Sequence, residues 1–114
     1  MKRKSVRPLD RATADEYASW FKALSDGTRI QVVSLLARVG VPMTVGQIVG
    51  AVDVGQSTVS QHLKVLADCG FVRVEHVGTA SWFRINDNCV ECFPTAADVV
   101  MGRPVPAVPA VPAE

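Results

Sequence analysis

The sequence lacks the features of membrane, secreted and disulfide-stabilised proteins. No run of apolar residues is longer than three, so we expect no transmembrane helix. The basic start Met1-Lys2-Arg3-Lys4 is not followed by an apolar stretch, so we expect no secretory signal. Three cysteines, an odd number, argue against a disulfide framework and favour a reducing cytoplasm as the location.

The sequence is also too short for most enzymes and contains few residues that could act as a catalytic base. Its 114 residues, 48% hydrophobic and 20% charged, allow one globular domain. The histidines are His62 and His76, and no glycine-rich phosphate loop follows a predicted strand. A redox enzyme with a Cys-x-x-Cys pair would need a strand–helix–strand setting, which the sequence does not predict. We therefore expect that the protein is not an enzyme.

Charge and proline are concentrated at the two ends. The net charge is +1, yet five of the twelve basic residues lie among the first eleven positions. Residues 1–9 are predicted to form a flexible basic arm, which is either simply solvated or in contact with phosphates. Residues 104–114 contain four prolines and are predicted to form a disordered Pro/Ala/Val-rich tail with no implied partner. The folded domain is predicted to span residues 10–103.

Helical periodicity dominates the predicted domain. Apolar residues at i, i+3, i+4 and i+7 predict four helices in succession, over residues 9–24, 28–39, 44–52 and 56–69. The segment Ser25-Asp26-Gly27 is predicted to supply a capping residue for the second, and Thr44 is predicted to cap the third. The predicted inner face of the second consists of Ile30, Val33, Leu36 and Ala37.

The periodicity then changes to that of strands. Residues 71–85 alternate apolar and polar side chains around a turn at Gly78-Thr79, which predicts a β-hairpin. Pro94 is predicted to occupy the first position of a last short helix that ends near Gly102. The predicted fold class is therefore mainly α with a small β-hairpin, in the order of a winged helix-turn-helix.

The fourth predicted helix presents a polar face without acidic residues before Asp68. Its apolar residues, Val59, Leu63 and Leu66, fall on one side at 100° per residue. Short hydroxyls, an amide and a lysine on the other side suit base edges and phosphates. A solvated helix face would also be polar, but most such faces contain glutamate. The candidate DNA-contacting residues of this helix are Gln56, Ser57, Thr58, Ser60, Gln61, His62 and Lys64.

Each of four residues, His62 among them, has two interpretations. His62 lies at the border of the two helix sides, where it is either a structural histidine or a DNA contact. His76, beside the hairpin turn, is either solvated or close to phosphate. Arg73 and Arg84 on the outer face of the hairpin are candidates for minor-groove phosphate contacts, although any two-layer hairpin shows such alternating charges.

Several of these segments resemble the ArsR/SmtB family of bacterial metal- and stress-responsive repressors. Residues 24–29 (Leu-Ser-Asp-Gly-Thr-Arg) resemble the start of the family's second helix, and residues 56–66 resemble its recognition helix. Residues 70–72 and 78–85 are similar to the strand and wing that follow. The resemblance implies a homodimer that binds an imperfect inverted repeat in double-stranded DNA and leaves it when an inducer binds.

The resemblance also implies that the first and last helices form the dimer interface. Independently, these helices have more apolar surface than a four-helix monomer needs, although core burial would explain each residue singly. The candidate interface residues are Tyr17, Trp20, Phe21, Phe93, Ala97 and Val100.

The metal sites found in members of the family are absent from the sequence. The stretch that would hold a Cys-x-Cys pair, residues 45–49, contains no cysteine, and the last predicted helix has Asp98 and no histidine. Instead, Cys89 and Cys92 lie between the wing and the last predicted helix, where they could bind one soft ion or close a disulfide. Cys69 is either a third ligand or a small core residue.

We therefore expect no required cofactor, but an inducer at Cys89 and Cys92. Three sulfur ligands would suit As(III), Sb(III), Cd(II) or Pb(II). Two other interpretations remain: a repressor that senses oxidation through this dithiol, and a repressor without a small inducer. A winged helix that binds protein instead of DNA would have an apolar or acidic outer face, which Ser57, Gln61 and Lys64 argue against.

Overall fold

The computed structural model describes residues 6–103, and residues 1–5 and 104–114 lie outside this part. The predicted arm is therefore described only over residues 6–9, which form no helix or strand, and the predicted tail is outside altogether. The described elements are α1 (Arg11–Ala23), α2 (Gly27–Val39), β1 (Met43–Thr44), α3 (Val45–Val52), α4 (Gln56–Asp68), β2 (Val72–Val77), β3 (Ala80–Ile85) and α5 (Asp87–Val100).

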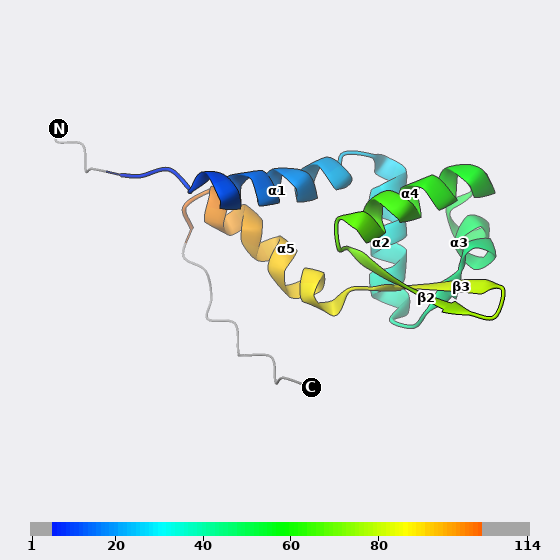
Figure 1. Cartoon of the computed structure of the whole chain (residues 1–114). Coiled ribbons are helices and arrows are strands. Elements are labelled where there is room, and N and C mark those ends of the chain that lie inside the picture. Colours follow the sequence, from blue (N-terminus) through cyan, green and yellow to red (C-terminus); the bar gives the residue numbers. More distant parts are fainter. Residues whose placement is uncertain (1–5, 104–114) are drawn as a thin grey trace.

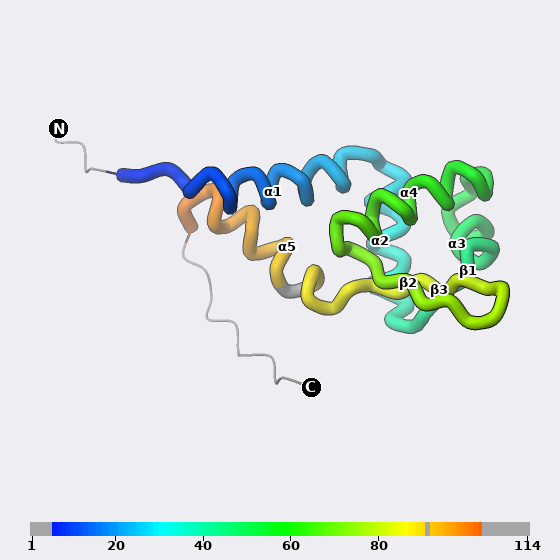
Figure 2. The backbone as a smooth tube through the Cα atoms, in the orientation of Figure 1, coloured from blue at the N-terminus to red at the C-terminus, as the bar shows by residue number. Residues whose placement is uncertain are grey.

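The elements form a body and a two-helix projection. Helices α2, α3 and α4 and the sheet make up the body, while α1 and α5 extend from it on the side opposite the β2–β3 turn (Figure 1). The backbone trace in Figure 2 shows that both ends of the described part of the chain lie at this projection, far from the hairpin turn. This is the winged helix-turn-helix predicted from the sequence, with α4 in the place of the recognition helix.

The predicted hairpin is part of a three-stranded antiparallel sheet in the order β1-β3-β2. Strands β2 and β3 pair from Val72 with Ile85 to Val77 with Ala80. The third strand, β1, pairs with β3 over two residues, Met43 with Phe83 and Thr44 with Trp82, and was not predicted. It is too short to show a period-2 pattern.

Capping residues start the helices where the sequence predicts them. The Asp26 carboxylate caps α2 by accepting hydrogen bonds from the backbone N–H groups of Thr28 (2.8 Å) and Arg29 (3.2 Å). Thr44 and Gln47 form a capping box at the start of α3. Local side-chain chemistry therefore determines both boundaries.

The inner face of α2 differs from the prediction. Val32 and Leu36 are fully buried, whereas Ile30 is 51% exposed and Ala37 is also exposed. Apolar residues occur almost all round this helix, so helical spacing alone cannot identify the buried side. Contacts with α3, α4 and β3 determine it.

The core lies between α2, α3, α4 and the sheet. Its largest fully buried side chains come from the three helices and from the residue just before β2, and are Phe71, Leu36, Ile48, Leu63, Leu66, Val32 and Val59. The three apolar residues predicted to anchor the fourth helix are all among them. The position of α4 is therefore fixed by its own buried stripe.

The start of the last helix was predicted wrongly. Helix α5 begins at Asp87, after Asn86, whose side chain accepts a hydrogen bond from the N–H of Asn88 as the N-cap. Pro94 lies inside the helix and not at its first position. Cys89 and Cys92 are therefore one turn apart within α5, and they do not precede it.

No helix among residues 6–103 is long and apolar enough to cross a membrane.

Candidate DNA interface and cysteine pair

Helix α4 is held by its inner side and leaves its outer side free. Val59, Leu63 and Leu66 are at most 1% exposed. The helix begins after Gly55, which provides no side-chain hydrogen bond to the first turn. Backbone N–H groups of this turn can therefore donate to an external acceptor such as a phosphate oxygen.

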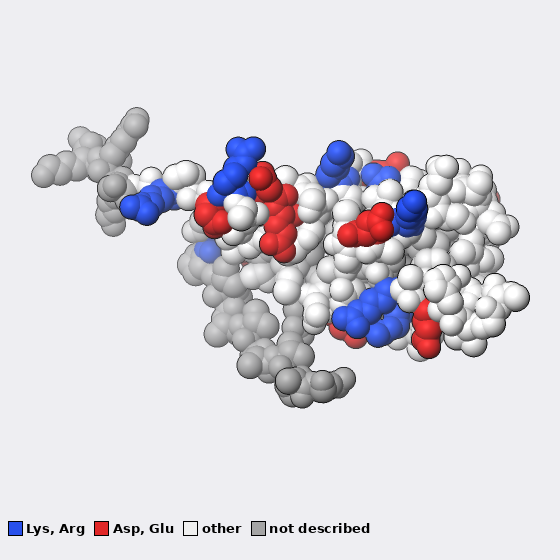
Figure 3. Space-filling view, viewed as in Figure 1, with Lys and Arg blue, Asp and Glu red and all other residues white. Residues whose placement is uncertain are grey.

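Up to Lys64, the outer side of α4 consists of neutral polar side chains with one lysine. The exposed residues of this part, all of them predicted DNA contacts, are Gln56, Ser57, Thr58, Ser60, Gln61 and Lys64. Val65 and the acidic Asp68, in the last turn, are exposed as well. In Figure 3 the end of the body that holds the start of α4 and the hairpin turn is almost free of charged atoms. This end can recognise a ligand by hydrogen bonds, while charged side chains of both signs lie further along the surface in this view.

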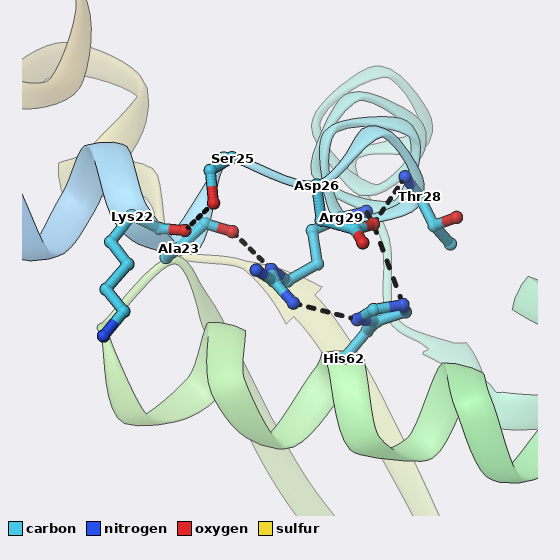
Figure 4. Close-up of polar contacts among 7 residues, drawn as sticks. All are labelled: Lys22, Ala23, Ser25, Asp26, Thr28, Arg29 and His62. Atoms are coloured by element: carbon cyan, nitrogen blue, oxygen red, sulfur yellow. Dashed lines mark hydrogen bonds and ion pairs between the residues drawn. The ribbon is translucent and has the colours of Figure 1, made fainter.

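The remaining predicted contact of α4, His62, faces the start of α2 (Figure 4). Its Nδ1 lies 3.2 Å from Nη1 of Arg29, which is a donor only, so Nδ1 accepts this hydrogen bond. Its Nε2 lies 3.7 Å from the Asp26 carboxylate. The imidazole is 14% exposed. His62 therefore links the recognition helix to α2.

The guanidinium of Arg29 extends this link to α1. Its Nε donates to the carbonyl oxygen of Ala23, the last residue of α1, at 2.5 Å. The backbone N–H of Arg29, that of Thr28 and the nearby His62 lower the pKa of Asp26, in this order of importance. Asp26 is therefore ionised at neutral pH, when it caps α2 and attracts the His62 ring.

The hairpin places its predicted contacts on opposite sheet faces. Arg73 and Arg84 are exposed, directly opposite each other on neighbouring strands, and Arg84 forms a 4.0 Å ion pair with Asp87. Two like charges in this position destabilise a hairpin unless an anion lies near them. By strand alternation His76 lies on the other face, where its Nδ1 is 2.9 Å from the Ser81 hydroxyl.

The three cysteines are free thiols with different surroundings. Cys92 is exposed, while Cys69, the C-cap residue of α4, and Cys89 are half-buried. The Cys89 thiol donates to the carbonyl oxygen of Gly70 at 3.0 Å, and the Asn86 amide donates to the same oxygen at 2.8 Å. Burial, and to a smaller degree Cys92, raises the pKa of Cys89. Cys89 therefore connects the start of α5 to the chain just after α4.

The described residues contain no cluster of three His, Cys, Asp or Glu side chains that could hold one metal ion. Cys69 is thus not combined with the Cys89 and Cys92 pair into a three-thiolate pocket within residues 6–103. The pair itself offers two ligands one helical turn apart.

The apolar faces of α1 and α5 meet through aromatic rings. The centroids of Phe21 and Phe93 are 5.5 Å apart, and Phe93 lies at a similar distance, 5.4 Å, from Phe71 in the core. Tyr17 and Trp20 stack at 5.2 Å further along α1. Phe21 is still 40% exposed and Val100 49% exposed. The two helices therefore present apolar surface that one protomer does not cover.

Comparisons with known proteins agree with this geometry. The family model described as bacterial regulatory protein, arsR family, matches residues 26–74. An uncharacterized HTH-type transcriptional regulator of Methanocaldococcus jannaschii is 35% identical over 77 residues, which cover 68% of this chain and 85% of the relative. The arsenical resistance operon repressor of Bacillus subtilis is 35% identical over 72 residues, which cover 63% of this chain and 68% of the relative. The chain belongs to the ArsR family.

A solved structure has a similar fold over most of the chain. The homodimeric winged helix-turn-helix DNA-binding domain of a possible ArsR-family regulator from Mycobacterium bovis has a TM-score of 0.66 and 29% identity, covering 89% of this chain and 91% of that one. This ArsR-family protein is a DNA-binding transcriptional regulator and not an enzyme.

Three residues important to the site of this ArsR-family protein were missed as site residues in the sequence. Arg29 and Asp26 hold His62, and Asn86 shares the Gly70 carbonyl with a cysteine. The capping pattern identified Asp26 only as a helix start. Sequence spacing gave no signal for Arg29 because its partner is 33 positions away.

Proposed function

We propose that the protein is a repressor that binds an imperfect inverted repeat as a homodimer. The exposed polar face of α4, which has no charged residue between Asp53 and Lys64, carries this proposal. The homodimeric state of the Mycobacterium bovis relative supports a dimer here. Its two recognition helices would enter successive major grooves roughly 34 Å apart.

Within this proposal the residues have three roles. Exposed residues of α4 contact bases and nearby phosphates, His62 positions α4 from behind, and basic residues of the wing bind phosphate. The proposed contacts are Gln56, Ser57, Thr58, Ser60, Gln61 and Lys64 on α4 and Arg73, His76 and Arg84 on the hairpin. The dimer would form through Tyr17, Trp20, Phe21, Phe93, Ala97 and Val100.

Fluorescence anisotropy on DNA from upstream of its own gene tests the DNA contact. Gln61→Ala should weaken binding about 5- to 150-fold, because a bidentate contact to a base contributes about 1–3 kcal/mol. Gln31→Ala, which removes an exposed amide from α2, is the matched control and should have no effect. Equal affinities of the two variants would contradict the proposed role of α4.

Salt dependence separates DNA binding from a protein-binding winged helix. A dimer with about 6–10 phosphate contacts should lose about 10³–10⁵ in affinity between 50 and 200 mM salt. Removing Arg84 should reduce this slope without changing sequence preference. A flat salt response would argue for a protein partner.

We propose further that a soft metal(loid), first of all arsenite, releases the repressor by binding Cys89 and Cys92. The name of the Bacillus subtilis relative supports arsenite as the first candidate, and Sb(III), Cd(II) and Pb(II) follow. Each thiol would give its proton to one hydroxide of As(OH)₃, which leaves as water, and the third hydroxide would remain unless Cys69 replaces it.

Loss of the Cys89 proton would be the structural signal. The thiol could then no longer donate to the Gly70 carbonyl, one residue after the C-cap of α4. A coupling of about 1–3 kcal/mol would weaken operator binding about 5- to 150-fold. The exposed Cys92 should react first and Cys89 later, because Cys89 is half-buried and its pKa is raised.

Titration of the operator complex with arsenite tests the inducer. Release by wild-type protein that is lost in Cys89→Ser and Cys92→Ser, but kept in Cys69→Ser, would support a two-thiolate site. Release by an oxidant such as diamide, without a response to arsenite, would favour the dithiol redox sensor. If neither arsenite nor diamide releases the protein from the operator, both forms of sensing at this pair are contradicted.

A further inference from the structure

We propose that an apolar pocket at the foot of α5 binds a small, uncharged aromatic molecule. The pocket has a volume of about 220 Å³. It is lined by Val33 and Ala37 of α2, by Ile85 at the end of β3, and by Phe93 and Pro94 of α5. Because three elements of one protomer line it, it is a half-open pocket and not a flat helix face.

The chemistry of the walls defines the class of ligand. Among the residues whose side chains the structure describes, no charged side chain lines the pocket, so an ion would lose its hydration without gaining a partner from them. Cavities of roughly 150 Å³ with apolar walls hold benzene, and this pocket can hold a molecule slightly larger. Phe71 and Phe93, which meet edge to face at 72°, add ring surface to the wall. One- and two-ring aromatic molecules therefore fit best.

Pro94 interrupts the backbone hydrogen bonding of α5 beside these walls. Proline has no backbone N–H, so Pro94 cannot give the helical hydrogen bond that the carbonyl of Val90 would otherwise accept. Val90 also lines the pocket and is 50% exposed. Cys89, the remaining wall residue, already donates its thiol proton to Gly70. With so little polar surface on the walls, a two-ring aromatic molecule such as indole matches the pocket through its rings.

The location of the pocket favours a small ligand over a second copy of the chain. The exposed apolar side chains of α5 assigned to the dimer, Ala97 and Val100, lie near the end of the helix. The lining residues Cys89 and Val90 lie in its first turn, and Phe93 and Pro94 lie at its middle, where Phe93 belongs to both sets. Contact of Phe93 with Phe21 would transmit occupancy to α1. Binding itself depends on neither the DNA contact nor the thiol chemistry proposed above.

The test uses 5-fluoroindole and ¹⁹F NMR with the full chain. Saturable line broadening is expected with wild-type protein. Ala37→Trp, which fills the pocket from an exposed position, should weaken binding at least tenfold, and Ala51→Trp, an exposed alanine on α3, is the matched control. Circular dichroism checks the fold of each variant, and Val90→Asp, which places a charge at the half-exposed wall, provides a second and independent loss of binding.

Three results would overturn the proposal. The first is no saturable binding by wild-type protein, and the second is equal binding by all variants, which would mean non-specific adsorption. The third is that Ala37→Trp separates the dimer in sedimentation while 5-fluoroindole binding is unchanged, in which case a second copy covers the pocket.

Discussion

Gly50 lies near the end of α3, and its replacement by alanine tests how backbone conformation limits the stability of this domain. An added Cβ would meet no atom within 4 Å, and the backbone is helical. Alanine is favoured over glycine in a helix by about 0.8–1.0 kcal/mol. Gly50→Ala should therefore raise the free energy of unfolding by about 1 kcal/mol and Tm by about 4–8 °C.

Gly40 provides the opposite case with the same chemical change. It is the C-cap of α2, its φ is 73°, and an added Cβ would again meet nothing within 4 Å. The left-handed conformation costs an L-residue about 1–2 kcal/mol, so Gly40→Ala should lower stability by about this amount. The contrast isolates backbone conformation, because neither substitution creates a clash.

Thermal and urea unfolding followed by circular dichroism at one protomer concentration measures both changes, since dimer formation makes Tm depend on concentration. Effects of the same sign for Gly50→Ala and Gly40→Ala would refute the reasoning. If Gly50→Ala stabilised the protein but weakened operator binding, the glycine would be needed for close approach of the DNA backbone to α3.

Two further predictions concern the core and pH. Leu66→Ala should destabilise the protein by about 2–5 kcal/mol in urea unfolding, whereas the exposed Val65→Ala should cost far less. The backbone N–H of Arg29 and the other donors lower the folded-state pKa of Asp26, so its contribution to stability is full above the unfolded-state pKa and is lost as pH falls through the folded-state value. Asp26→Asn, which can still cap α2, should make the urea midpoint less dependent on pH below about pH 4. A pH profile identical to that of the wild-type protein would contradict this assignment.

The sequence predicts α4 more reliably than α5, and the reason is the number of independent signals. In α4, three apolar residues at helical spacing and a preceding glycine agree on both position and orientation. In α5, Pro94 suggests a helix start, but the true start at Asn86 depends on one short side-chain cap. A proline inside a helix weakens one turn, and the packing of Phe93 and the buried Ala96 compensates for it.

The candidate site was predictable on its exposed side only. The hydroxyl and amide residues of α4 are predicted as DNA contacts because no acidic residue lies among them, and this is a local property of the sequence. The contact between Arg29 and His62 and the contact between Cys89 and Gly70 join positions far apart in the chain. Such contacts arise from tertiary packing and leave no periodic pattern in the sequence.

These two contacts hold the middle of α4 and the segment that follows its C-terminal end. His62, in the middle of α4, is bound through Arg29 to the last residue of α1, and the segment after α4 is bound through Gly70 to the start of α5. Because α1 and α5 are also the helices proposed to join the two protomers, a change at the dimer interface would reach the recognition helix by both routes. The angle of α4 would then be set by the same helices that set the spacing between the two half-sites, so a small rearrangement of α5 could alter both together.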